Sequence, residues 1–295
     1  MFPFEEIHVR QKGSVLYAPG ISDDSSGLAA LLYLCKAFQN TGLPKQGSLT
    51  VVATVGEEGL GNLRGVRHHF SKYQKSIHYF VSLDGCESER LVIVGLGSKR
   101  VRIVLRSPGG HSWADAGIPN PIHAAGELLF RINRLTLPKV PKTVINVGII
   151  SGGTSINAIP TEMHCDVDLR SESREQLAAL DQFLQRSLND ISTSNPQIET
   201  ELQVLGERPS GSISADHPLV KAAIDANQQF GLAAKTDTGS TDSNIPLALG
   251  VPAITLGVGG KCGKIHTPEE WYDVKDVERG LKRSALLIVE LLLSG

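Results

Sequence analysis

Acidic residues and one histidine recur in short, glycine-flanked segments where their side chains could share a cation. In chain order these residues are Asp23, Asp24, Glu57, Glu58, Asp84 and His266. Carboxylates gathered at one edge of a sheet repel one another unless a cation neutralises them, and a mixed set of Asp, Glu and His suits Zn²⁺, Mn²⁺ or Co²⁺. Any one of these residues alone is more often an ordinary capping or surface residue. The complete set predicts a metal site.

Two expected strands and one expected helix place these residues at loop edges. A strand predicted from Leu49 to Val55 ends in the two glutamates, and a second from Ile77 to Leu83 ends in Asp84. Apolar residues at helical spacing predict a helix from Asp24 to about Gln39, so the aspartate pair lies where a loop enters that helix. In open α/β sheets the carboxyl ends of the strands form the ligand-binding edge. The placement therefore indicates a site.

Residues 98–206 show a different order of predicted strands and helices. Alternating and helical patterns there predict the order β-α-β-β-α-β, which is the ferredoxin-like unit and can stand as its own domain. Turn-rich connectors flank this stretch, and beyond it a helix from Pro218, a strand from Pro252 and a helix from Asp276 restore the α/β texture. We expect an α/β domain over residues 1–97 and 207–295 with the ferredoxin-like domain inserted into it.

The composition excludes several classes of protein. Of the 295 residues 20% are charged and the formal net charge is -2, so no basic excess attracts nucleic acid or anionic lipid. The longest apolar run, near Ser284 to Leu293, is interrupted by Glu290 and is too short to span a membrane. Four cysteines lack C-x-x-C spacing, which fits a reducing compartment better than a disulfide framework. Since the first residues do not read as a signal peptide, we expect a cytoplasmic protein.

Two other enzyme or binding classes fit the sequence poorly. A serine hydrolase would contain G-x-S-x-G, and this motif does not occur in the chain. Glycine-rich segments at Gly59–Gly65 and Gly257–Gly263 suggest a nucleotide-binding loop, but their glycine spacings match neither G-x-G-x-x-G nor the Walker pattern.

Several segments in order along the chain resemble the signature blocks of the M20 metallohydrolases. These segments are LYAPGISDDSSGLAALL, VVATVGEEGLGNLRGVRHHF, SLDG, SPGGHSW, GGTSINAIPTEMHCDVDLRS and STDSNIPLALGVPAITLGVGG...IHTPEEW. The family includes carboxypeptidases, aminoacylases, deacylases and aminotripeptidases. The resemblance implies a zinc-peptidase-like catalytic domain with a mixed sheet and an inserted ferredoxin-like domain that serves as lid and dimerisation surface.

The resemblance also implies roles for the acidic residues and the late histidine. Asp23 would bridge two divalent metal ions, zinc foremost with cobalt or manganese as alternatives, and the peptide bond after it would be cis. Glu58 and His266 would complete one metal site, and Asp84 would belong to the other. Glu57 would be the general base that takes a proton from the attacking water.

Three residues of the inserted domain match further family positions. His111 resembles a histidine that reaches the active site of a neighbouring subunit and stabilises the oxyanion, which implies a homodimer. Asn157 and Arg170 match positions that hold a substrate carboxylate, which implies a small peptide or an N-acyl amino acid as substrate. The ordinary interpretation, in which Asn157 serves a turn and Arg170 pairs with a strand neighbour, stays open.

The chain departs from the family pattern at its start. The family's first metal ligand is a histidine in an H-x-D block, and this sequence opens with Met1-Phe2-Pro3 at the position where that block would continue. We expect one impaired metal site in the chain as written, and we hypothesise that its coding start was assigned too late. The alternative is a truncated or inactive protein that keeps the fold without turnover.

Overall fold

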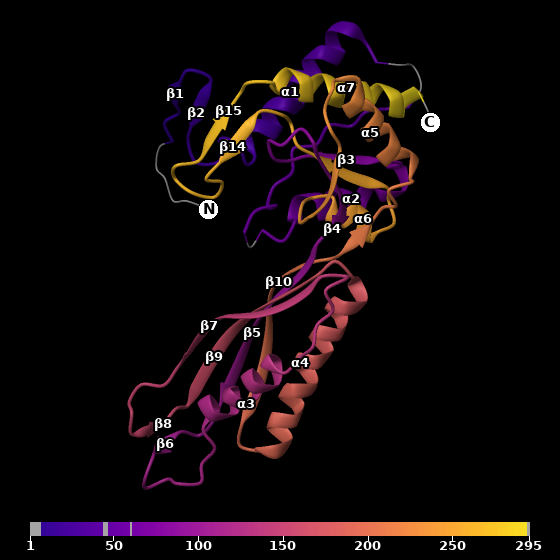
Figure 1. The fold of residues 1–295 in the computed structure, drawn as a ribbon. Helices are drawn as coiled ribbons and strands as arrows, with labels where there is room; N and C mark the ends of the chain where they lie inside the picture. The colour runs from indigo at the N-terminus through magenta and orange to yellow at the C-terminus, as the bar shows by residue number, and fades with distance from the viewer. Residues whose placement is uncertain (1–6, 44–46, 60, 294–295) are drawn as a thin grey trace. The chain divides into compact units, whose positions relative to one another are not determined.

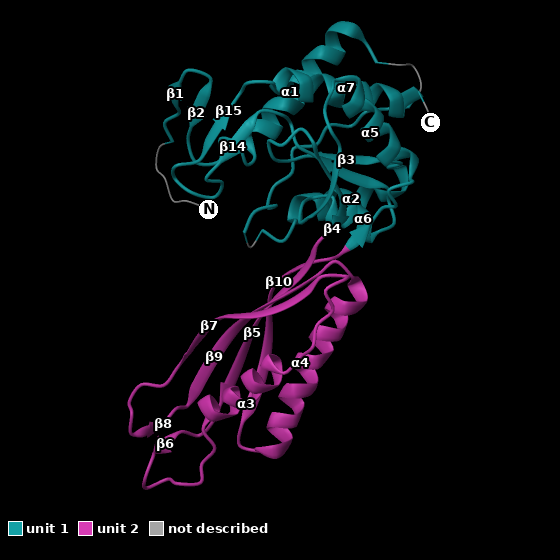
Figure 2. Cartoon of the chain, in the orientation of Figure 1, with its two compact units in different colours: residues 1–95, 211–295 teal, residues 96–210 magenta. Residues whose placement is uncertain are grey.

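The computed structural model describes residues 7–43, 47–59 and 61–293, and the chain divides into two compact units (Figure 2). Unit 1 comprises residues 1–95 and 211–295, and unit 2 comprises residues 96–210. The chain leaves unit 1 at the end of one strand and re-enters it at the start of another. Each unit is described by itself.

Unit 1 is built on a mixed sheet with the strand order β11-β4-β13-β3, and β12 also pairs with β4, along its whole length (Figure 1). β13 runs parallel to β3 and antiparallel to β4, and β12 runs parallel to β4. The mixed α/β character expected from the sequence is therefore confirmed. The strands are β3 (Phe80–Leu83), β4 (Arg90–Gly95), β11 (Gly211–Ser212), β12 (Lys235–Gly239) and β13 (Ala253–Leu256).

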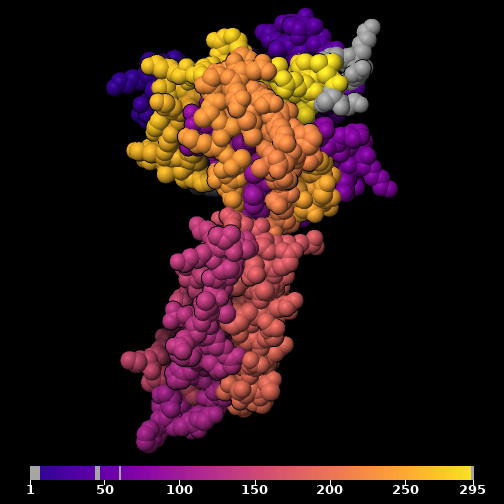
Figure 3. Space-filling model, turned by 45° about the vertical axis from the view of Figure 1, so that its right-hand side comes forward, coloured from indigo at the N-terminus to yellow at the C-terminus, as the bar shows by residue number. Residues whose placement is uncertain are grey.

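Helices cover both faces of this sheet (Figure 1). α5 and α7 share one apolar core with β13, and α2 and α6 share another with Phe80 of β3. α1 contacts both β3 and α7, so in Figure 3 early residues in indigo lie beside C-terminal residues in yellow. The helices are α1 (Ser25–Thr41), α2 (Arg64–Tyr73), α5 (Pro218–Gln229), α6 (Asn244–Ala248) and α7 (Val277–Leu293), with a 3₁₀ turn at Gln74–Ser76.

A small antiparallel sheet in unit 1 pairs strands from an early and a late part of the sequence. Its strand order is β1-β2-β15-β14, with Leu16 opposite Tyr272 in the register. The strands are β1 (Arg10–Lys12), β2 (Val15–Tyr17), β14 (Lys261–Gly263) and β15 (Trp271–Asp273). This sheet brings the loop that follows β2 next to the loop between β14 and β15, which are the loops that carry Asp23 and His266.

Unit 2 is an antiparallel sheet with the strand order β10-β5-β9-β7, and α3 and α4 lie on one side of it (Figure 1). Residues at every second position of β9 are buried and pack with apolar residues of both helices. The elements are β5 (Gly97–Arg106), α3 (Pro121–Asn133), β7 (Thr143–Gly152), β9 (Glu162–Ser171), α4 (Arg174–Ser194) and β10 (Glu199–Arg208), with a short pair β6 (Gly110–His111) and β8 (Ala158–Ile159).

The expected strand from Leu49 to Val55 is wrong. Among the described residues this segment pairs with no strand, and the Val55 carbonyl instead accepts from the Gly65 amide at 2.9 Å. Val51 and Val55 are 42% and 61% exposed, so the apolar run is not buried as the prediction required. A run of apolar residues becomes a strand only where a neighbouring backbone completes its hydrogen bonds.

A disulfide links two distant segments of unit 1. Cys86 and Cys262 form a disulfide across 176 residues of sequence, whereas the cysteine spacing was expected to fit a reducing compartment better than a disulfide framework. Their spacing gave no signal because the fold, not the sequence, brings them together.

Within the described residues no helix is both long and apolar enough to cross a membrane. The compartment stays a prediction.

Candidate metal centre

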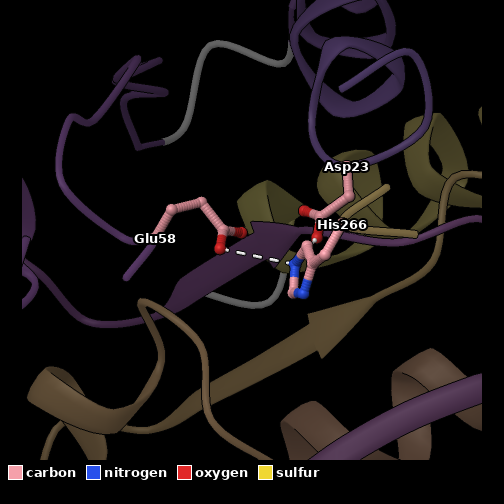
Figure 4. Close-up of side chains that lie close together, drawn as sticks. All are labelled: Asp23, Glu58 and His266. Atoms are coloured by element: carbon pink, nitrogen blue, oxygen red, sulfur yellow. Dashed lines mark hydrogen bonds and ion pairs between the residues drawn. The ribbon is translucent and has the colours of Figure 1, made fainter. Parts of the chain in front are cut away.

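Three loops of unit 1 bring Asp23, Glu58 and His266 together (Figure 4). Asp23 lies just before α1, Glu58 lies in the turn that precedes α2, and His266 lies in the loop between β14 and β15. One donor atom from each residue lies within 4.8 Å of the other two. The three residues are up to 243 positions apart in the sequence, so the fold alone creates this cluster.

The imidazole of His266 lies between the two carboxylates. Its Nε2 is 2.8 Å from Oδ2 of Asp23 and 3.4 Å from Oε2 of Glu58. The Asp23 side chain is 14% exposed, whereas those of Glu58 and His266 are 53% and 67% exposed. The cluster therefore has one sheltered carboxylate and an open side that water and a small substrate can reach.

Several carboxyl groups around the cluster have raised pKa values. Burial raises the pKa of the Asp24 carboxyl to about 8, and the charge of Asp84 adds to this effect. Burial also raises the pKa of Asp84 to about 6 and raises that of Glu58, in both cases with the charge of Asp23 as the second cause. Burial lowers the pKa of His266, but the two adjacent carboxylates outweigh it and raise that pKa overall.

This donor set fits a divalent cation. A cation among the carboxylates would remove the repulsion that keeps protons on them. Carboxylate oxygens and an imidazole nitrogen are donors that Zn²⁺, Co²⁺ and Mn²⁺ accept. The residues can therefore hold a divalent metal ion.

The start of α1 fixes the aspartate pair locally. The Asp23–Asp24 peptide bond is cis, as the family resemblance implies. The Asp24 side chain caps α1 by accepting from the Gly27 amide at 3.0 Å. A Cβ at Gly27 would lie 2.4 Å from the Asp24 carboxylate and 2.6 Å from the Leu83 carbonyl, so only glycine lets the helix start this close to the end of β3.

Asp84 and Glu57 lie near the three-residue cluster but are not part of it. Asp84 directly follows β3, its amide donates to the Leu256 carbonyl at 3.0 Å, and its carboxyl interacts with Asp23. Glu57 is half-buried, and its side chain hydrogen-bonds that of Glu58. Asp84 therefore adjoins the Asp23 side of the cluster, and Glu57 adjoins the Glu58 side.

The three remaining predicted residues lie in unit 2. His111 and Asn157 are neighbours, because β6 pairs with β8 and the Ser112 amide donates to the Asn157 carbonyl at 3.0 Å. Arg170 lies near the far end of β9, where its Nε donates to Asp168 at 2.7 Å. The ordinary interpretation of Arg170, an ion pair with a strand neighbour, describes a contact that is present.

Sequence reasoning missed one residue that contacts the Asp23 loop directly. Glu270 is only 1% exposed, and its carboxylate accepts hydrogen bonds from backbone amides of that loop. The Cys86–Cys262 disulfide was also missed, and it joins the segment after Asp84 to β14, just before His266. The segment IHTPEE contains Glu270, but nothing in it separates this residue from the adjacent Glu269.

Comparison with known protein families identifies the family of this chain. The model of Peptidase family M20/M25/M40 matches residues 2–290. The chain belongs to this family. Membership of M20 identifies the chain as a hydrolase and, by family, a metallopeptidase, and it supports the hydrolysis of amide bonds in peptides or acylated amino acids.

Individual M20 relatives resemble the chain over most of its length. It is 26% identical to carboxypeptidase G2 of Pseudomonas sp. (strain RS-16), covering 96% of this chain and 68% of the relative. It is 25% identical to acetylornithine deacetylase of Myxococcus xanthus, covering 93% and 72%. The structure of a Staphylococcus aureus tripeptidase superposes with a TM-score of 0.82 at 22% identity, covering 99% and 78%, which supports the fold.

Proposed function

We propose that this chain is a metal-dependent hydrolase of amide bonds in short peptides or N-acyl amino acids. The observation that carries the proposal is the convergence of Asp23, Glu58 and His266 from three loops. The names of the M20 relatives, a carboxypeptidase and an acetylornithine deacetylase, support this substrate class. Substrates of this class are small and polar, which suits a cluster with one open side.

The residues of unit 1 would hold two divalent ions, zinc foremost. Asp23, Glu58 and His266 would hold one ion, and Asp23 and Asp84 would contribute to the second. A bound divalent ion would lower the pKa of a water molecule and polarise the scissile carbonyl.

Glu57 would act as the general base. Its side chain lies beside Glu58, a residue that would hold the ion, so it could take a proton from the attacking water. Glu57 would then pass this proton to the nitrogen as the amide bond breaks. The role requires a carboxylate that is near the ligands without being one of them.

His111 would donate a hydrogen bond to the oxyanion that forms on the substrate. Its Nδ1 accepts from the amides of Trp113 and Ala114, at 3.2 and 3.3 Å. An imidazole that accepts at Nδ1 carries its proton on Nε2 in the neutral form, so Nε2 is a donor. This tautomer is the one that oxyanion stabilisation needs.

The arrangement of unit 2 supports a homodimer. From Glu162 to Arg170 the strand β9 advances roughly 26 Å at about 3.3 Å per residue. His111 and Asn157 lie beyond the Glu162 end, so a dipeptide-sized substrate cannot touch Arg170 and this pair from the same copy. We propose that unit 2 is a ferredoxin-like lid that gives His111 and Asn157 to the partner's site, and that Arg170 binds a substrate carboxylate.

A hydrolysis panel tests the proposed function. The chain is assayed with Zn²⁺, Co²⁺ or Mn²⁺ against N-acetyl and N-succinyl amino acids, dipeptides and tripeptides. We expect metal-dependent release of an amino acid, and a fall of about 10²- to 10⁴-fold in kcat for Glu57→Gln with metal binding retained. A wild-type chain that binds metal without hydrolysing any member of the panel would favour the inactive alternative.

A further inference from the structure

The buried carboxylate of Glu270 lies inside the loop that carries Asp23. Oε1 accepts from the amides of Ser22 and Asp23, both at 2.9 Å, and Oε2 accepts from the amide of Gly20 at 3.0 Å. The Glu270 backbone carbonyl also accepts from the Ala18 amide at 3.1 Å. Four amides of the segment 18–23 therefore bind one residue that is 248 positions later in the sequence than Ser22.

These hydrogen bonds replace secondary structure in the Asp23 loop. The segment lies between β2 and α1 and contains only turns, so no strand or helix ladder fixes its backbone. Hydrogen bonds from amides to a carboxylate are about twice as strong as those between neutral groups, and burial strengthens them further. Glu270 thus holds the backbone from which the Asp23 side chain extends, because the Asp23 amide is itself one of the donors.

The loop between β14 and β15 carries both Glu270 and His266. Glu270 follows His266 by four residues. Two turns hold the segment between them: the Thr267 amide donates to the Lys264 carbonyl, and the Glu270 amide donates to the Thr267 carbonyl. One segment therefore supplies one cluster residue and holds another by its backbone. The 2.8 Å contact between Asp23 and His266 is the geometric result.

We propose that Glu270 is the positioning residue for Asp23: its carboxylate holds the Gly20–Asp23 loop so that the Asp23 side chain points at the cation shared with His266. This inference rests on the proposed metal function. A merely structural Glu270 would stabilise the loop without changing cation affinity.

The variant Glu270→Gln tests this inference because it keeps the size of the side chain. The amide has a single acceptor oxygen, and its NH₂ group would face a backbone N–H that also donates. We expect at least a tenfold faster hydrogen exchange at the amides of Gly20, Ser22 and Asp23, with no comparable change in α4 of unit 2. The neighbouring exposed glutamate provides the matched control, Glu269→Gln, which should exchange as the wild-type chain does.

Metal titration of the same variants separates positioning from simple support. Calorimetry with Co²⁺ should show a roughly 10- to 100-fold loss of affinity for Glu270→Gln, the range found when a group that orients a ligand is removed. The visible spectrum of bound Co²⁺ should change, and kcat should fall more than KM rises. Glu269→Gln should leave all three unchanged. Glu270→Asp keeps the charge but shortens the side chain, so its affinity for Co²⁺ should lie between those of wild type and Glu270→Gln. If Glu270→Gln fails to fold, Glu270→Asp replaces it in both measurements.

The outcomes are distinct. Unchanged exchange at the three amides would overturn the proposal, and so would faster exchange with wild-type Co²⁺ affinity and spectrum. A wild-type chain that binds no Co²⁺ would overturn the proposed metal function and with it any role of Glu270 towards a cation. Wild-type binding with equal binding by Glu270→Gln would overturn the role of Glu270 alone.

Discussion

Different kinds of interaction stabilise the interior of unit 2 and the functional loops of unit 1. Unit 2 has four strands of ten residues each, paired in one antiparallel sheet over one apolar core. The functional loops of unit 1 are instead tied by single polar or covalent links between distant residues. These links are Glu270 to the Asp23 loop, the Cys86–Cys262 disulfide and the buried Arg283.

Arg283 illustrates the links of unit 1. Its side chain is fully buried on α7, where it donates to the carbonyls of Gly257 and Ser88 and to Oδ1 of Asn227. Burial lowers the pKa of this guanidinium to about 10. The arginine thereby joins the segment after β3 to the segment after β13. The comparison teaches that the functional loops of unit 1 depend on individual polar or covalent links, whereas unit 2 depends on one filled apolar core.

The largest effect on stability should come from the core of unit 2. Leu184 of α4 is fully buried in that core. Leu184→Ala removes apolar contacts and leaves a cavity, so we expect a loss of about 2–5 kcal/mol in the free energy of unfolding, measured by urea titration. Affinity for Co²⁺ should not change. A coupled loss of metal affinity would show that the distinction between the units is wrong.

A somewhat smaller loss is expected from the buried arginine of unit 1. Arg283→Met keeps the apolar bulk but leaves the carbonyls of Ser88 and Gly257 without this donor. Buried unsatisfied acceptors cost about 1–3 kcal/mol each, and relief of the buried charge offsets part of this, so we expect a net loss of about 2 kcal/mol. Urea titration measures it. Wild-type stability would contradict the importance given to polar links in unit 1.

The sequence predicted unit 2 better than unit 1 for a physical reason. The helix α4 buries Leu177, Leu180, Leu184, Leu188 and Ile191, and this spacing is visible in the sequence and identifies a helix directly. The short strands β4 and β12 carry no such period, and they exist because they pair with each other. The predicted strand at Leu49–Val55 failed for the converse reason, since an apolar run does not reveal whether a partner strand is present.

The candidate site was predictable in its residue types but not in its supports. Asp23, Glu58 and His266 were expected together because their flanking blocks resemble one family, and the structure places them in one cluster. Glu270 acts on backbone amides, which every residue has, so no sequence pattern could identify its partners. The roles of His111, Asn157 and Arg170 and of the two domains stay predictions.

The smallest effect should come from a surface ion pair of unit 2. Arg102 donates two hydrogen bonds to Asp166 across neighbouring strands, at 2.7 and 2.8 Å, and its side chain is 38% exposed. Exposed pairs of this kind contribute little because water screens them. Arg102→Met should leave the urea midpoint within experimental error, in contrast to the same substitution at Arg283. A loss equal to that of Arg283→Met would contradict the comparison.

The central claim is that His266 completes a cation site with Asp23 and Glu58, and metal titration of His266→Ala tests it most directly. His68, an exposed histidine on α2, provides the matched control His68→Ala. Calorimetry with Zn²⁺ should show wild-type affinity for the control. For His266→Ala it should show a loss greater than the roughly 10- to 100-fold that removal of a supporting group causes. Equal Zn²⁺ affinity and stoichiometry in His266→Ala and wild type would contradict the account.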